Sequence, residues 1–239
     1  AGEILEMAIS RYFFLIGWGA FYIAIGFSAR VAESERRASA FARAAQTAEL
    51  RALRYQVNPH FLSNTLNSLS ALVMNNRRTE AETMIMNLSN FYRTSLAGEP
   101  TEDVTLAEEI ELQKLYLDIE KVRFPDRLSV EIDVPDALRD VEVPGLILQP
   151  LVENAVKHGV SAVARPVALR IAASAAAEKL TITVTDTGNG TGDSGSKGNG
   201  IGLANVRDRL FARFGGNAAL TCGPSDNGGY CVTLTIPMA

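Results

Sequence analysis

Apolar residues recur every three or four positions through the first half of the chain, a spacing that predicts amphipathic helices. In the segment 59–73 they form one stripe, made of Leu62, Leu66, Leu69 and Val73. His60, one of only two histidines in the chain, falls on the roughly opposite face together with Asn64. We therefore expect a helix that buries its leucines and presents the imidazole outward. Because Pro59 lacks an amide proton, we expect the helix to bend there.

A second helix is expected after the polar turn at 74–78. Thr79 and Glu82 have the spacing of a capping box at its start. Its apolar face consists of Ala81, Met84, Ile85, Leu88 and Phe91. The two helices form a short hairpin whose apolar surface is too large for one chain to bury. We therefore predict a homodimer in which two hairpins make a four-helix bundle.

The N-terminal residues have the composition of a membrane helix. No charged residue occurs from Tyr12 to Ala29, and a helix of that length spans roughly 27 Å, close to a hydrocarbon core of about 30 Å. Arginines are more frequent after this run than before it, which predicts that the C-terminal side lies in the cytoplasm and that the chain is anchored in the inner (cytoplasmic) membrane. A buried core helix and a signal peptide are the alternatives.

Small residues continue the helical pattern beyond this segment. They form a heptad seam made of Val31, Ala38, Phe41, Ala45, Ala48 and Ala52. Such a seam is typical of a parallel coiled coil, and we expect a signalling helix that leads into the His60 region. Because alanine favours any helix, a plain connector is the alternative.

The pattern changes after about residue 104. Thr105 and Glu108 repeat the capping-box spacing at the start of a third helix, which Phe124-Pro125-Asp126 ends. Beyond it, alternating positions predict strands, and helical spacing returns twice. The expected strands cover 128–134, 167–173, 180–186, 219–222 and 230–236, and the expected helices cover 146–160 and 201–214. We therefore predict an α+β protein in which helices precede an α/β layer domain.

Composition argues against some classes of function. The net charge is −4 and the isoelectric point is about 5.4, so nucleic acid is not expected as a partner, because phosphate-backbone recognition needs a basic surface. Cys222 and Cys231 flank a glycine-rich turn, and we expect reduced thiols there, with a disulfide as the alternative. No metal-ligand spacing occurs in the sequence.

Three clusters in the second half carry candidate chemistry. In the first, the three- and four-residue spacings of Asn154, Lys157 and His158 place them on one helix face. An amide oxygen beside cationic nitrogens suits a magnesium-bound triphosphate. This cluster predicts that the phosphates of a nucleotide lie along that helix.

The other two clusters are rich in glycine. Asp186 ends a strand before Gly188 and Gly190, where a carboxylate can accept the exocyclic amine of adenine and glycines let the backbone approach the ring. The third cluster, Gly198-Asn199-Gly200-Ile201-Gly202-Leu203, opens directly into a helix whose first amides can bind phosphates. Each glycine run alone is as typical of a turn as of a nucleotide loop. The late glycines and the absence of Gly-Lys-Ser/Thr exclude a Rossmann fingerprint and a P-loop.

In this order, and with His60 upstream, the clusters resemble the asparagine box and two glycine boxes of sensor histidine kinases with a GHKL (Bergerat-type) ATPase domain. The sequence Pro59-His60-Phe61-Leu62-Ser63-Asn64-Thr65-Leu66-Asn67 is similar to the corresponding motif of the LytS-type membrane sensor kinases. So are Arg123-Phe124 with Asp126-Arg127-Leu128, and the segment 148–154. The similarity runs from about Leu50 to Pro237.

The resemblance implies a role for each matching position. His60 matches the phospho-acceptor, and Glu153, beside the matched Asn154, is expected to be a proton acceptor or water-orienting group. Asn64, one turn after His60, is expected to orient the imidazole or a water. Asn154 matches the magnesium-binding asparagine, and Asp186 matches the adenine-binding aspartate. The other nucleotide-binding positions are Lys157, His158, Gly188, Gly190, Gly198, Gly200, Gly202 and Leu203. The chain departs from the family at Ser63, where phenylalanine is usual, and no carboxylate follows His60 directly.

The resemblance also implies an organisation and a function. It implies a transmembrane helix at 1–30, a coiled coil at 31–52, a dimerisation and phospho-acceptor hairpin at 53–99 and a GHKL ATP-binding domain at 104–239. The implied function is a protein-histidine kinase that uses ATP and Mg²⁺ to phosphorylate His60 and then phosphorylates a response-regulator aspartate. Two other functions fit the same residues: a membrane-anchored dimer that signals without catalysis, and a GHKL ATPase that only hydrolyses ATP.

Overall fold

The computed structural model describes residues 14–19, 58–97, 102–189, 200–225 and 228–238. The chain divides into one unit from Ala1 to Asn58 and a second from Pro59 to Ala239. In the first unit, residues 14–19 are helical and Phe14 and Trp18 are exposed. Within the described ranges, no helix is long and apolar enough to cross a membrane. Most of the expected membrane segment and the whole expected coiled coil at 31–52 lie outside the described residues.

The second unit begins with a hairpin of two helices, α2 (Pro59–Met74) and α3 (Arg78–Ala97). Asn58 lies outside α2, so Pro59 is the first helical residue, where its missing N–H breaks no helical bond. The chain before Asn58 lies outside the described residues, so the bend expected at Pro59 stays a prediction. The expected capping box of α3 is wrong. The helix begins one residue before Thr79, and Glu82 pairs with Arg78 at 3.0 Å instead.

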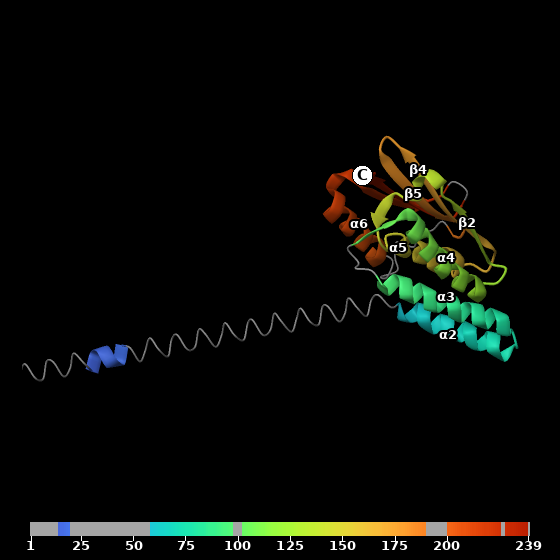
Figure 1. The fold of residues 1–239 in the computed structure, drawn as a ribbon, viewed down its shortest axis with the longest axis horizontal. Coiled ribbons are helices and arrows are strands. Elements are labelled where there is room, and N and C mark those ends of the chain that lie inside the picture. Colours follow the sequence, from blue (N-terminus) through green and yellow to red (C-terminus); the bar gives the residue numbers. More distant parts are fainter. Residues whose placement is uncertain (1–13, 20–57, 98–101, 190–199, 226–227, 239) are drawn as a thin grey trace, which may run out of the picture. The chain divides into compact units, whose positions relative to one another are not determined.

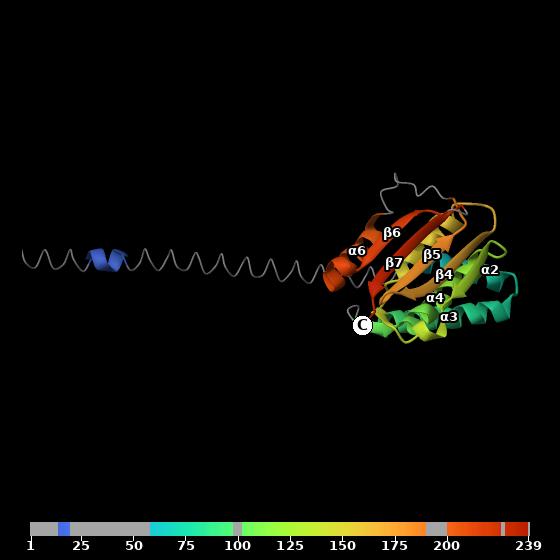
Figure 2. The same ribbon diagram turned by 90° about the horizontal axis from the view of Figure 1, so that it is seen from above.

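After the hairpin come a long helix and a five-stranded sheet (Figures 1 and 2). The helix is α4 (Leu106–Arg123), and its capping box is confirmed: the Thr105 hydroxyl accepts the Glu108 N–H, and the Glu108 carboxylate accepts the Thr105 N–H. The strands are β2 (Leu128–Asp133), β4 (Val167–Ala176), β5 (Lys179–Asp186), β6 (Ala219–Pro224) and β7 (Tyr230–Pro237). Every strand expected from the sequence is present.

The sheet has the order β2-β4-β5-β7-β6, in which β2 runs parallel to β4 and the other pairs are antiparallel. Two short strands, β1 (Asp103–Thr105) and β3 (Glu142–Pro144), make a separate pair that the sequence did not predict. The remaining elements are η1 (Asp136–Leu138), α5 (Gln149–Asn154), η2 (Ala155–Val160), α6 (Gly200–Phe214) and η3 (Gly215–Asn217). The expected α+β class with an α/β layer domain is confirmed.

The helices α4 and α6, together with η2, pack against one face of the sheet. The core between the two layers is closed, because its central leucines are fully buried. These are Leu106, Leu148, Leu151, Leu169, Leu180 and Leu234. The opposite face carries half-buried threonines of β5 and β7, such as Thr183 and its register partner Thr233.

The two cysteines are free thiols. In the register of β6 and β7, Cys222 lies opposite Val232, and Cys231 is the neighbour of Val232 along its strand. Because successive side chains of a strand point to opposite faces, the two thiols lie on different faces of the sheet. The disulfide alternative is thereby excluded.

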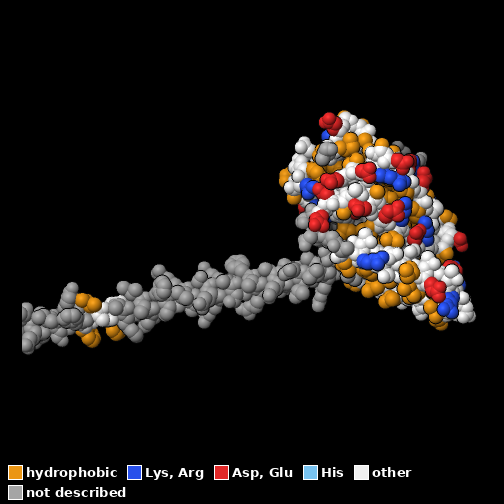
Figure 3. Space-filling view, in the orientation of Figure 1, with side chains coloured by type: hydrophobic (Ala, Val, Ile, Leu, Met, Phe, Trp, Pro, Cys, Tyr) orange, Lys and Arg blue, Asp and Glu red, His pale blue; other side chains and the backbone are white. Residues whose placement is uncertain are grey.

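The hairpin packs on α4 with a different face from the one expected. Phe61, Thr65 and Leu72 are the buried residues of α2, whereas Leu66 and Val73 of the expected stripe are 50% and 61% exposed. The buried face of α2 is rotated by about one residue from the expected stripe, because α4 packs against that side of the helix. Leu66 and Val73 therefore remain on the surface, whereas Leu62 and Leu69 of the same stripe are half-buried. Figure 3 shows apolar side chains gathered over the hairpin.

Candidate functional site

His60 lies in the first turn of α2 and its side chain is exposed. The amide nitrogen of Asn64, one helical turn further on, lies 3.2 Å from Nδ1 and 3.2 Å from Nε2 of the imidazole. A single amide donor can therefore bond to whichever ring nitrogen is unprotonated. The expected outward orientation of His60 is confirmed, and its contact with Asn64 restricts the rotation of the ring.

The residue next to His60 fixes this helix to the rest of the chain. Phe61 is 4% exposed, and its ring centroid lies 5.0 Å from that of Tyr116 on α4 and 5.5 Å from that of Phe91 on α3. These separations are typical of favourable aromatic pairs. The aromatic cluster Phe61, Phe91 and Tyr116 therefore holds the histidine-bearing end of α2 on the same helix that packs against the sheet.

Asn154, Lys157 and His158 lie along one continuous helical segment, as expected. Asn154 ends α5, and Lys157 and His158 follow in η2, which is a π-helix. The wider turn is visible in the bond from the Ser161 N–H to the Val156 carbonyl, five residues back, at 2.9 Å. Single π-helical turns inside α-helices occur often at functional sites. Lys157 is exposed and Asn154 and His158 are half-buried, so all three are accessible to a ligand.

Asp186 ends β5 and is only 2% exposed. Its Oδ1 accepts the Gly188 N–H at 2.8 Å, which fixes the carboxylate at the edge of the sheet. Burial raises the pKa of Asp186, and the backbone N–H groups of Gly188 and Tyr230 oppose this rise. A buried carboxylate with part of its acceptor capacity free suits a single exocyclic amine of a base.

Glycines pack closely around this carboxylate. A Cβ added to Gly159 would lie 2.6 Å from Cγ of Asp186, and one added to Gly188 would lie 2.5 Å from Cα of Gly159. At Gly229, a Cβ would lie 1.9 Å from the Asp186 carbonyl oxygen. No side chain fits at these three positions. Gly159 and Gly188 join the asparagine cluster to the aspartate cluster by direct backbone contact.

The third cluster is described in part. Gly200 begins α6, and a Cβ on Gly202 would lie 3.8 Å from Cβ of Pro150 at the start of α5. Leu203 packs against the core. The N-terminus of α6 therefore lies beside the helix that carries Asn154, as a phosphate-binding role requires. Gly190 and Gly198 lie outside the described residues.

Glu153 precedes Asn154 and faces the hairpin side of the domain. Its Oε1 accepts the Gln149 side-chain N–H at 2.9 Å, and its negative charge raises the pKa of Tyr92 on α3 and of Tyr116 and Glu120 on α4. For all three groups, burial is the larger cause. The carboxylate therefore lies on the side of α5 that faces the aromatic cluster around Phe61.

Several residues of the site were not singled out from the sequence. Gly159 and Gly229 enclose Asp186, and Arg165 donates to the Gly188 carbonyl at 3.0 Å. Arg127, which the sequence placed in a family motif without a role, donates to the Val160 carbonyl at 2.8 Å at the end of η2. A glycine inside a helical pattern, as at Gly159, is a signal of close packing that the sequence does offer. The arginine contacts depend on loop conformation and carry no such signal.

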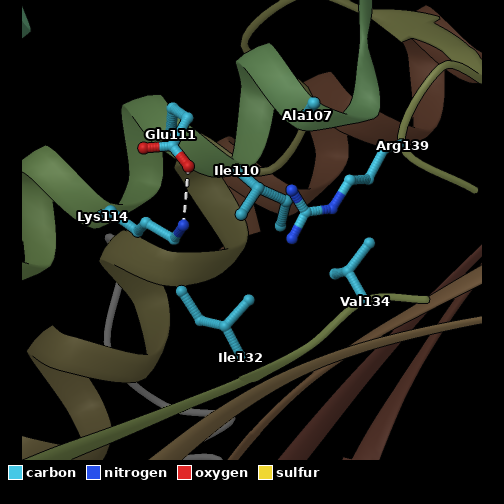
Figure 4. Close-up of a pocket in the computed structure, with 7 residues that line it drawn as sticks. All are labelled: Ala107, Ile110, Glu111, Lys114, Ile132, Val134 and Arg139. Carbon is cyan, nitrogen blue, oxygen red and sulfur yellow. Dashed lines mark hydrogen bonds and ion pairs between the residues drawn. The ribbon is translucent and has the colours of Figure 1, made fainter. Parts of the chain in front are cut away.

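The structure also has a cavity of about 100 Å³ outside this region (Figure 4). It lies between the first half of α4 and β2, with Ile110, Ile132 and Val134 as its apolar lining. Arg139 reaches over it, and Lys114 pairs with Glu111 at 2.6 Å. None of the expected site residues lines this cavity, so it is not the nucleotide site.

In the described part of the chain, no group of three or more His, Cys, Asp or Glu side chains could hold a metal ion. A site built from protein carboxylates alone is therefore not found there. The amide oxygen of Asn154 is the kind of ligand that Mg²⁺ takes together with substrate phosphates and water. This residue fits a magnesium ion that arrives with a nucleotide.

Two family models match the chain. Residues 48–128 match the model described as histidine kinase. Residues 140–239 match the model described as histidine kinase-, DNA gyrase B-, and HSP90-like ATPase. The first range contains His60, and the second contains all three nucleotide clusters. The first range covers the hairpin and α4, and the second covers α5, η2, α6 and every strand of the five-stranded sheet except β2.

Curated relatives agree with these matches. Over 113 residues the chain is 47% identical to the sensor histidine kinase BtsS of Escherichia coli (strain K12), which covers 47% of this chain and 20% of the relative. Over 111 residues it is 42% identical to the sensor histidine kinase/phosphatase LytS of Staphylococcus aureus (strain Mu50), which covers 46% and 19%. The chain thus matches about a fifth of the length of each relative.

The histidine kinase domain of the Erythrobacter litoralis EL346 blue-light activated histidine kinase is similar to 75% of this chain. The match covers 93% of that domain, at 18% sequence identity and a TM-score of 0.45.

Proposed function

We propose that this chain, which belongs to the sensor histidine kinases, is the kinase core of a two-component sensor. It transfers the γ-phosphoryl group of ATP to His60 and then passes that group to an aspartate of a response regulator. The observation that supports this most is the combination, in one chain, of an exposed histidine on α2 with a domain that brings Asn154 and Asp186 together through Gly159.

The chemistry at His60 needs a free ring nitrogen and a fixed ring. One imidazole nitrogen attacks the γ-phosphorus, the bond from that phosphorus to the bridging oxygen of ADP breaks, and the ring loses its proton. The unprotonated nitrogen of an imidazole is a nucleophile. The Asn64 amide nitrogen, 3.2 Å from Nδ1 and from Nε2, orients the ring before the reaction, and its N–H gives up the bond to the unprotonated nitrogen when that nitrogen attacks. In the second step the P–N bond breaks as a regulator carboxylate forms an acyl phosphate.

The nucleotide lies between α5, η2 and the start of α6. Asp186 accepts the amine of adenine, and Gly188 lets the backbone approach the base. Lys157, His158 and the N-terminus of α6 at Gly200 and Gly202 bind the phosphates. The remaining glycine positions, Gly190 and Gly198, border the same loops. Leu203 packs below the first turn of α6 and keeps it against the core.

Magnesium is assigned to Asn154. When bound, Mg²⁺ neutralises the charge that develops on the transferred phosphoryl group. We assign Glu153 the role of proton acceptor or water-orienting group, because it precedes Asn154 and its charge acts on Tyr92 and Tyr116, whose rings contact Phe91 of the hairpin. Positioning and charge neutralisation supply most of the catalysis.

The active form is a homodimer anchored in the inner membrane. The exposed apolar residues of the hairpin support dimerisation, since a four-helix bundle of two hairpins buries them. They include Leu66, Val73, Met74, Ile85 and Met86. The uncharged run from Tyr12 to Ala29, followed by several arginines, supports the anchor and places the kinase in the cytoplasm beside its regulator.

The test is incubation with γ-labelled ATP and Mg²⁺. The native chain incorporates acid-labile, base-stable label, as a phosphoramidate does, whereas His60→Gln and Asn154→Ala incorporate at least about a hundredfold less. Ser63→Ala and Asn217→Ala, at exposed positions outside the assigned roles, are matched controls and keep native labelling. Label that persists in His60→Gln contradicts the acceptor.

Nucleotide binding measured on the same proteins separates the other outcomes. His60→Gln binds ATP as the native chain does, because the acceptor is not part of the nucleotide site. If the native chain binds ATP but never labels, it is a signalling dimer without catalysis. If it releases phosphate at the same rate with and without His60, it is a simple ATPase.

A further inference from the structure

The loop that leads into α5 is held in an unusual conformation. Leu146 has a φ of 60°, in the left-handed region that residues with a side chain rarely adopt. Gln149, the first residue of α5, follows almost at once, and no side chain caps this helix at Leu148. A strained backbone of this kind persists only where the surrounding structure fixes it. Something other than the loop itself therefore determines where α5 begins.

Glu109 of α4 supplies that constraint. Its side chain is 2% exposed, its Oε2 accepts the Leu146 N–H at 2.8 Å, and its Oε1 accepts the Leu148 N–H at 2.8 Å. One carboxylate thus binds the strained residue and the residue that precedes α5. Burial raises the pKa of Glu109, while these two N–H bonds and the charge of Arg209 oppose the rise.

Arg209 ties the same loop to α6. Its Nη1 donates to the Gly145 carbonyl at 2.7 Å, and its charge interacts with that of Glu109. The loop 145–148 is therefore held from α4 by a carboxylate and from α6 by a guanidinium. Because the loop leads directly into α5, the contact with Arg209 connects α5 to α6. These two helices carry Asn154 and the glycines Gly200 and Gly202.

We infer that Glu109 and Arg209 are positioning residues of the nucleotide site, which set α5, with Asn154, against the N-terminus of α6. This inference rests on the proposed function, since it concerns the same nucleotide. Neither residue contacts the nucleotide: both act through the loop 145–148. Loss of either shifts Asn154 relative to the phosphates and so weakens the magnesium-dependent part of binding.

The experiment measures the dissociation constants of MgATP, and of ATP in EDTA, for the whole chain. Glu109→Gln places an NH₂ group against one of the two backbone donors, and we expect MgATP binding to weaken at least tenfold. For the same variant, the dissociation constant of ATP in EDTA differs from the native value by less than threefold. Glu111→Gln, an exposed carboxylate on the same helix, is the matched control and binds like the native chain. All measurements are made well below the melting temperature, where a lower global stability alone leaves the chain folded and its affinity unchanged.

A second variant tests the mechanism. Glycine adopts a positive φ without strain, so Leu146→Gly added to Glu109→Gln restores at least threefold of the lost MgATP affinity. If Glu109→Gln does not fold, Arg209→Lys keeps the charge but loses the planar donor to Gly145, and its MgATP binding weakens at least threefold. The inference is overturned if Glu109→Gln, or in its place Arg209→Lys, binds MgATP within twofold of Glu111→Gln.

Asn154→Ala, measured in parallel, separates the two proposals. If it leaves the difference between MgATP and ATP in EDTA unchanged, the proposed role of Asn154 fails, whatever Glu109 does. If it removes that difference while Glu109→Gln does not reduce it, the nucleotide site stands and the positioning role of Glu109 fails.

Discussion

The hairpin and the α/β layer of this chain differ in how completely they bury their apolar residues. In the layer, Leu106, Leu148 and Leu169 are fully buried. In the hairpin, Leu66 and Val73 are half or more exposed, and Met74 is 80% exposed. Both regions have the apolar pattern of a core, but only the layer completes its core within one chain.

This difference suggests that one step of the proposed reaction needs a single chain and the other step needs two chains. The groups assigned to ATP lie on the layer, whose core needs no partner. The assigned phospho-acceptor lies on α2, whose apolar face at Leu66 and Val73 points away from α4 and is left for a second hairpin. Nucleotide binding is thus expected of a monomer, and phosphorylation of a dimer.

The largest expected effect comes from charging the open face of α2. Leu66→Glu with Val73→Glu places carboxylates in the dimer interface and weakens dimerisation by about 4 kcal/mol, roughly a thousandfold in dissociation constant. Sedimentation equilibrium measures this change. MgATP affinity stays native in the monomeric variant, while labelling of His60 falls. Ala71→Glu, exposed on the other side of α2, is the control and stays dimeric. A monomeric variant that still labels His60 at the native rate would show that phosphorylation does not need a dimer.

The next effect concerns the layer alone. Gly159→Ala forces a methyl group against the Asp186 carboxylate, and we expect a loss of about 3 kcal/mol in the free energy of unfolding together with loss of ATP binding. Urea unfolding and nucleotide titration measure the two. Gly216→Ala, where a Cβ meets open space, is the control and changes neither by much. Dimerisation through the hairpin should persist in both variants. Native ATP binding by Gly159→Ala would show that the glycine contact does not shape the site.

A smaller effect is expected at Glu120, on the boundary between the regions. Burial raises the pKa of Glu120 from 4.5 to about 6, although Arg123 opposes this. Since the folded pKa exceeds the unfolded one, the stability from this group is fully present below pH 4.5 and is lost as the pH rises through 6, by about 2 kcal/mol. In Glu120→Gln this dependence of the unfolding free energy on pH is absent. Urea unfolding at several pH values measures it, and parallel curves for the native and variant chains would contradict the prediction.

The smallest effect compares two threonines with the same sequence signal. Thr105→Ala removes a capping box that the structure contains and costs about 1 kcal/mol of unfolding free energy. Thr79→Ala changes stability by less than about 0.3 kcal/mol, because Thr79 lies inside α3 and caps nothing. Thermal melts of the two variants measure the difference. Equal losses of unfolding free energy in the two variants would contradict the assignment of a cap to Thr105 but not to Thr79.

The five long strands and the helix α6 of the layer could be predicted from the sequence, because the strands alternate and the helix is periodic. The helix expected at 146–160 begins only at Gln149, and its second half is the π-helix η2. Asp186 was placed at the end of a strand, as found, and Gly202 in the first turn of α6. The order of the strands was not predictable, since β2 pairs with β4 rather than with a neighbour in sequence. The pair β1 and β3 was also missed, because three-residue strands carry too little pattern.

In the hairpin the sequence predicted the helices but not which face of α2 is buried. The stripe at Leu66 and Val73 is apolar, as a core stripe is, but the side that α4 covers is defined by Phe61 and Leu72. Periodicity shows which residues avoid water and not which neighbour covers them. For the same reason Glu109 was not singled out: a carboxylate in an amphipathic helix resembles a solvent-exposed residue until the loop it binds is placed in three dimensions.

The π-helical turn at Ala155–Val160 has a consequence for insertions and deletions. In an α-helix each residue advances the side chains by about 100° around the axis, so the wider turn acts as one extra residue and rotates everything that follows. Deletion of a single residue between Val156 and Gly159 would restore the ordinary pitch and turn the following side chains by that angle. The chemistry assigned to this helix therefore depends on the number of residues in the turn as well as on their identity.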